Sequence, residues 1–123
     1  MDKRVLLIED EPSIIEAIRF ILTRDGWAVQ SHSEGGTAVA RVREARPDVV
    51  ILDVMLPGKS GFDILDELRA DPDLHQLPVL LLTARGQSAD RERAERAGAS
   101  RFMTKPFSNA EVLASVKALV EGL

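Results

Sequence analysis

Apolar residues gather into three uninterrupted runs along this chain, at positions 5–8, 49–52 and 79–82. Each run is short and built of Val, Ile and Leu, which predicts strands buried on both faces of a sheet. Two further runs, 27–32 and 99–103, mix apolar with polar residues and predict strands at the sheet edges.

Between these strands the apolar residues recur at helical spacing. Four predicted helices run between residues that start or stop helices: Pro12 and Gly26, Ala38 and Pro47, Ser60 and Asp71, and Ala89 and Gly98. Ser108 and Glu111 predict a capping box that opens the fifth helix. The stripe at 89–97 carries only alanines among many arginines and glutamates. It therefore has little to bury, and we expect this fourth helix to be the most loosely packed.

Five strands that alternate with five helices predict an α/β fold with a parallel sheet, right-handed crossovers and helices on both faces. The most apolar strands belong in the middle and the mixed ones at the edges. This ranking fits the strand order 2-1-3-4-5, a doubly wound, flavodoxin-like arrangement. Residues 1–123 form a single domain in this interpretation.

Composition narrows the class of protein. The chain is 45% hydrophobic but only 4% aromatic, so its core must be aliphatic. A formal charge of −4 argues against direct nucleic-acid binding, and the lack of cysteine excludes disulfide and thiol chemistry. No apolar stretch approaches the ~20 residues of a membrane span, which favours a cytoplasmic protein without membrane contact.

The central run ends in Asp53, and Pro57-Gly58 mark the turn that follows. Asp53 is either a nucleophile at the mouth of a parallel sheet or an ordinary carboxylate that ends a strand. Because a lone buried aspartate is costly, we expect it at the strand's exit and partly in water.

Ligands of such sheets bind beyond the carboxyl ends of the strands, where the winding reverses between strands one and three. The residues that leave the strands near this point are Glu9 and Asp10, Asp53, Thr83, and Lys105. Three carboxylates at one point repel one another unless a cation joins them. Oxygen ligands without histidine or cysteine favour Mg²⁺ or Mn²⁺ over zinc.

A metal, an ammonium group and a hydroxyl around a carboxylate are typical of a site for phosphoryl transfer, with Asp53 as the nucleophile that forms an acyl phosphate. Lys105 and Thr83 would contact the phosphoryl oxygens. Each residue also has a plainer interpretation. The acids at 9–11 could supply charge to a helix N-terminus, which we accept for Glu11; Thr83 could be a strand-end hydroxyl and Lys105 a solvated loop lysine.

The chain resembles the receiver domains of two-component response regulators along nearly its whole length. The motifs that carry the resemblance are LLIEDEP, ILDVMLPG, LLLTA and FMTKPF. The resemblance implies phosphotransfer to Asp53 from the phosphohistidine of a histidine kinase or a histidine phosphotransfer protein. It also implies Mg²⁺ held by Glu9, Asp10, Asp53 and the Met55 backbone carbonyl, and a cis peptide bond before Pro106.

The same resemblance implies a switch in which Thr83 moves toward the phosphoryl group and Phe102 turns into the vacated space. The face formed by the fourth helix, fifth strand and fifth helix would then control a downstream protein or output domain. Alternatively, Phe102 is permanently buried core. Ser100-Arg101 replace the acidic residues that usually precede the switch aromatic in receivers of winged-helix regulators, which weakens the case for their phosphorylation-dependent dimer without removing it.

Met55 and Arg85 occupy positions that modulate hydrolysis in this family, and they predict slow self-dephosphorylation. We expect a phosphoacceptor rather than a turnover enzyme, either a stand-alone receiver or part of something longer. An aspartyl phosphatase is disfavoured because no Asp-x-Asp-x-Thr motif is present. A flavin-binding protein of the same fold is disfavoured because no phosphate loop rich in hydroxyl side chains and glycine follows the first strand. A degenerate receiver that serves only as a dimerisation surface is disfavoured because all five site positions are filled.

Overall fold

A computed structural model describes residues 3–84 and 88–121 of the chain. Its five strands form one parallel sheet in the order β2-β1-β3-β4-β5, so the predicted doubly wound topology is confirmed. The strands are β1 (Arg4–Ile8), β2 (Ala28–His32), β3 (Val49–Asp53), β4 (Val79–Thr83) and β5 (Arg101–Thr104). The helices are α1 (Pro12–Arg24), α2 (Ala38–Ala45), α3 (Gly61–Ala70), α4 (Ser88–Ala97) and α5 (Asn109–Glu121).

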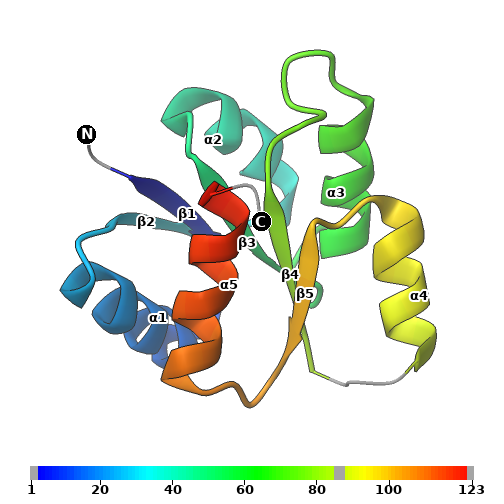
Figure 1. The fold of residues 1–123 in the computed structure, drawn as a ribbon. Helices are drawn as coiled ribbons and strands as arrows, with labels where there is room; N and C mark the ends of the chain where they lie inside the picture. Colours follow the sequence, from blue (N-terminus) through cyan, green and yellow to red (C-terminus); the bar gives the residue numbers. More distant parts are fainter. Residues whose placement is uncertain (1–2, 85–87, 122–123) are drawn as a thin grey trace.

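The two faces of the sheet bury separate cores, because side chains alternate along each strand. In β1, Val5 and Leu7 pack with α1 and α5, whereas Leu6 and Ile8 pack with α2 and α3. Figure 1 shows α1 and α5 together on one side of the sheet, away from α3 and α4. Strands β1, β3 and β4 are the apolar runs, and nearly all their residues are buried, as the sequence predicts for central strands.

Capping residues fix where the helices begin. The Ser60 hydroxyl accepts hydrogen bonds from the backbone N–H groups of Phe62 (3.1 Å) and Asp63 (3.4 Å) at the start of α3. Before α5, Ser108 N–H donates to Glu111 Oε1 at 3.2 Å and Glu111 N–H donates to Ser108 Oγ at 3.1 Å. This reciprocal pair is the predicted capping box.

Two predicted strand boundaries need correction, and one short element was not predicted. β5 covers Arg101–Thr104 rather than 99–103, because Ala99 N–H bonds to Ala94 O at 3.0 Å and so still belongs to the end of α4. β2 begins one residue late, because Trp27 N–H is held by Leu22 O at 3.0 Å. A short 3-10 helix, η1 (Gly35–Thr37), precedes α2 and was not predicted.

Candidate functional site

The carboxyl ends of the strands bring the predicted residues together. Glu9 and Asp10 follow β1, Asp53 ends β3, and Thr83 ends β4. Lys105 follows β5, and its backbone N–H donates to the backbone carbonyl oxygen of Thr83 at 2.8 Å. In Figure 1 this edge is where β5 leads into the connection to α5.

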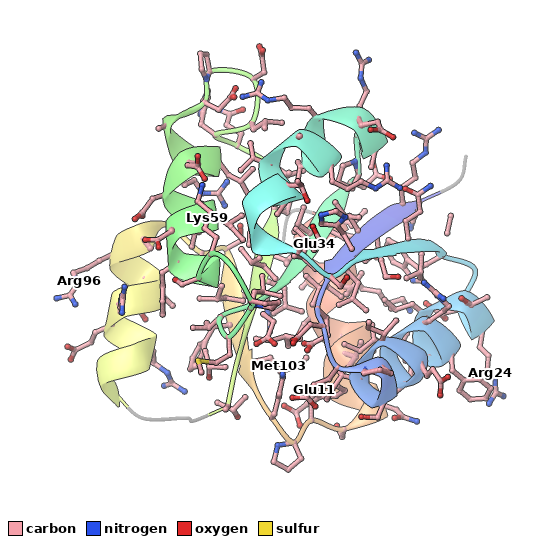
Figure 2. The ribbon with its side chains drawn as sticks, turned by 180° about the vertical axis from the view of Figure 1, so that it is seen from behind. Glu11, Arg24, Glu34, Lys59, Arg96 and Met103 are labelled. Carbon is pink, nitrogen blue, oxygen red and sulfur yellow. The ribbon has the colours of Figure 1, made fainter. Side chains whose placement is uncertain are left out.

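A lysine bridges two of the acids. Lys105 Nζ lies 3.2 Å from Asp53 Oδ2 and 3.3 Å from Glu9 Oε2. It also lies 3.9 Å from Oε1 of Glu11, an exposed residue at the beginning of α1 that Figure 2 labels. The sequence predicted only that Glu11 supplies negative charge to a helix N-terminus, and it did not predict this third ion pair. The acidic run 9–11 beside a helix start was its only signal.

Asp53 is only 2% exposed, which corrects the expectation that it lies partly in water. Burial is tolerated because both carboxylate oxygens have partners: Oδ1 accepts the Met55 N–H at 3.2 Å, and Oδ2 faces Lys105. Asp10 is exposed, so among the three acids it is the one on the solvent side.

Glu9 is fully buried, and its charge is the most costly in the site. Burial, followed by interaction with the neighbouring Asp53 carboxylate, raises the pKa of Glu9 to about 7, against the opposing effects of the Glu11 N–H and Lys105. Burial alone would lower the pKa of Lys105, but attraction to Asp53 and Glu9 outweighs it and raises that pKa. Lys105 therefore stays charged beside the two carboxyl groups.

The donor set fits a hard divalent cation. Carboxylate oxygens of Glu9, Asp10 and Asp53 lie within 4.8 Å of one another. Glu9 Oε2 is buried without a hydrogen-bond partner among the described residues, since its 3.3 Å ion pair with Lys105 lacks hydrogen-bond geometry. An all-oxygen cluster with an orphaned acceptor suits Mg²⁺ or Mn²⁺.

Close backbone packing holds this edge in place. A Cβ on Gly61 would lie 2.3 Å from the Asp53 carbonyl oxygen and 2.8 Å from Val54 Cα, so the start of α3 can approach β3 only with glycine here. Gly61 N–H donates to Val54 O at 2.9 Å. Sequence reasoning did not single out Gly61; its signal is a glycine directly after an N-cap serine, inside a helix that it otherwise destabilises.

The structure also describes most of the other residues singled out in the sequence. Thr83 is buried, and the peptide bond between Lys105 and Pro106 is cis, as the resemblance implies. The Met55 side chain is 71% exposed. Arg85 lies outside the described residues.

Phe102 is half-buried against the core that faces α2, α3 and α4, and the Arg91 guanidinium lies 4.9 Å from its ring centroid. Phe102 is therefore not fully buried core in this structure. None of the helices in the described part of the chain combines the length and the hydropathy that crossing a membrane requires.

The family model of the response regulator receiver domain matches residues 5–117. The chain belongs to this family. It is 44% identical over 116 residues to the "Probable transcriptional regulatory protein TcrX" of Mycobacterium tuberculosis, a match that covers 94% of this chain and 49% of the relative. The chain spans about half the length of the curated relatives it matches.

Solved receiver structures agree with this assignment. Chemotaxis response regulator CheY4 of Vibrio cholerae superposes with a TM-score of 0.90 at 27% identity, covering 97% of this chain and 99% of that one. The receiver domain of sensor histidine kinase PA1611 from Pseudomonas aeruginosa superposes with a TM-score of 0.89 at 29% identity, covering 98% and 99%. That second structure has a magnesium ion coordinated in its active-site cleft.

Proposed function

We propose that residues 1–123 act as one phosphorylation-controlled receiver in which Asp53 accepts a phosphoryl group from the phosphohistidine of a histidine kinase or a histidine phosphotransfer protein. The observation that carries the proposal is the contact of Lys105 with both Asp53 and Glu9, at 3.2 and 3.3 Å, inside a cluster of three acids. The site thus combines a nucleophile, a cation and a place for a divalent ion.

In the proposed step a carboxylate oxygen of Asp53 attacks phosphorus as the bond between phosphorus and the histidine nitrogen breaks. The imidazole leaves, and Asp53 becomes an acyl phosphate. Glu9, Asp10, Asp53 and the Met55 carbonyl would hold Mg²⁺, which neutralises phosphoryl oxygens. Lys105 would pair with a second phosphoryl oxygen and the Thr83 hydroxyl would donate to a third.

The output would be a change on the face formed by α4, β5 and α5, with Thr83 and Phe102 as the moving residues. That face would control a downstream protein or an attached output domain, and the chain would work in the cytoplasm. Activation could also promote a dimer, which size-exclusion chromatography with and without beryllofluoride would test.

Incubation with phosphoramidate and Mg²⁺, followed by intact-mass measurement, tests the phosphoacceptor proposal. One phosphoryl group should be added to the parent protein and none to the Asp53→Asn variant or in the presence of EDTA. Continuous turnover of a generic phosphate ester would instead favour an aspartyl phosphatase.

The lifetime of the phosphorylated state is a separate part of the proposal. The Met55 side chain carries no group that could orient an attacking water, which favours slow self-dephosphorylation. Met55→Asn should accelerate the decay of the acyl phosphate, and Arg85→Ala should do the same if Arg85 shields it. Unchanged decay rates in both variants would contradict this part alone.

A further inference from the structure

Helix α4 contributes little to the hydrophobic core. Of its described side chains, Ala94 is the apolar one that is fully buried, and Ala97 is half-buried. The arginines and glutamates between them are exposed, so burial of apolar surface holds this helix only weakly. Other contacts must therefore decide where α4 lies.

The end of α4 is fixed by Arg69, a side chain of α3. Its guanidinium donates to Gly98 O at 2.8 Å and to Ser100 Oγ at 3.3 Å. It also donates to Leu77 O at 2.8 Å and His75 O at 3.1 Å. A Cβ on Gly98, whose φ is +89°, would lie 3.2 Å from Arg69 Cγ, so the turn after α4 packs directly on this side chain.

Two arginines hold the other half of α4. The Arg91 guanidinium lies 4.9 Å from the ring centroid of Phe102 in β5, and that of Arg93 lies 4.1 Å from the ring of Phe62 in α3. Residues two apart do not share a helix face, so these contacts lie on different flanks of α4. Attraction between a guanidinium and an aromatic face thus takes over part of the role of apolar packing.

The partners of these arginines differ in their freedom. Phe62 is 4% exposed, and it belongs to the buried core at the start of α3. Phe102 is half-buried and is packed at the margin of that core. A turn of the Phe102 ring would break its contact with Arg91, whereas the Phe62 ring is enclosed by the core.

We propose that Arg91 is a positioning residue that latches Phe102, and with it the α4–β5 surface, in the unphosphorylated arrangement. The proposal rests on the proposed function, because Phe102 is the residue that moves there. A contact made in one state and lost in the other biases the equilibrium by its own free energy. Arg91 thus opposes the switch.

The test compares Arg91→Gln with two matched variants in the full chain. Arg93→Gln removes the other ring contact of α4, and Arg96→Gln removes a charge from the same helix, at a side chain that projects outward in Figure 2. Arg91→Lys restores a cation. The readouts are the rate of Asp53 phosphorylation by phosphoramidate with Mg²⁺ and the ¹⁹F resonance of Phe102 after incorporation of 4-fluorophenylalanine at the four Phe positions.

Arg91→Gln should raise the phosphorylation rate about two- to fivefold, and Arg91→Lys should return it toward the parent value. In Arg91→Gln without phosphodonor, the Phe102 resonance should shift toward its position in the phosphorylated parent. Equal rates in the Arg91→Gln, Arg93→Gln and Arg96→Gln variants, with an unshifted Phe102 resonance, would overturn the latch but leave the phosphoacceptor proposal intact. A parent chain that accepts no phosphoryl group would overturn both.

Discussion

The Lys105 ammonium lies 3.2 Å from Asp53 Oδ2, although 52 residues separate the two in the chain. Asp53 and Glu9 are both buried, so this one cation balances two carboxylates that would otherwise repel each other. These ion pairs add little net stability to the folded state, because burying the charges costs about as much as their attraction returns. Without them, however, the two acids could not be buried as carboxylates.

Stability should fall as pH rises from about 4.5 to about 7 in metal-free protein. Burial raises the pKa of Glu9 from 4.5 to about 7, so in this window the folded state holds a proton that the unfolded chain has released. The free energy of unfolding of the parent should decrease by on the order of 2–4 kcal/mol over this window, and the Glu9→Gln variant should not show this decrease. Urea unfolding in EDTA at several pH values measures it. Glu92→Gln, at an exposed position in α4, is the control, and an identical slope in both variants would refute the assignment.

Replacement of Lys105 by Gln should weaken the metal-free protein and strengthen its magnesium binding. Without the ammonium, Glu9 and Asp53 lose their shared counter-charge, and a divalent ion no longer competes with it for the same oxygens. We expect a roughly three- to tenfold lower dissociation constant for Mg²⁺. Thermal melts over a series of Mg²⁺ concentrations give the constant, and an unchanged or higher value would be the contrary result.

Gly61→Ala should destabilise the fold by roughly 1–3 kcal/mol and lower the phosphorylation rate, because the new methyl group would strike the Asp53 carbonyl at 2.3 Å. Gly36→Ala is the matched control, since a Cβ there meets nothing within 4 Å. Denaturant unfolding and phosphoramidate kinetics should separate the two variants. Similar behaviour of both would show that α3 can shift freely away from β3.

Arg69→Lys should cost about 2–4 kcal/mol, although it keeps the charge, because an ammonium cannot replace the four-way contact of the guanidinium. Burial lowers the pKa of Arg69, which is consistent with its enclosed position. Arg96→Lys, an exposed change in α4, should be nearly neutral in the same urea titration. Equal costs for the two changes would mean that the turn after α4 does not depend on this anchor.

The topology could be read from the sequence because its determinants are local. Continuous apolar runs such as 49–52 require burial on both faces, and the helical stripes between them require crossovers. The same logic placed Glu9, Asp53 and Lys105 at one edge, because the carboxyl ends of parallel strands meet there. The predicted capping pair Ser108 and Glu111 is likewise a local pattern.

What escaped prediction depends on contacts between distant residues. The full burial of Asp53 requires α3 to close over β3, which the lack of a side chain at Gly61 permits. The Arg69 anchor joins segments about thirty residues apart, and no periodicity encodes such a bond. The small number of apolar residues in α4 correctly indicated that it adds little to the core. The sequence did not indicate that Arg91 and Arg93 contact aromatic rings in β5 and α3.

The most direct test of the central claim is the chemical identity of residue 53 after phosphorylation. Borohydride reduction of an aspartyl phosphate expels phosphate and converts that aspartate to homoserine, which peptide mass mapping locates. After treatment with phosphoramidate and Mg²⁺, the account predicts homoserine at position 53 and nowhere else. Unmodified Asp53, with the phosphoryl group on His32 or His75 or absent altogether, would contradict it.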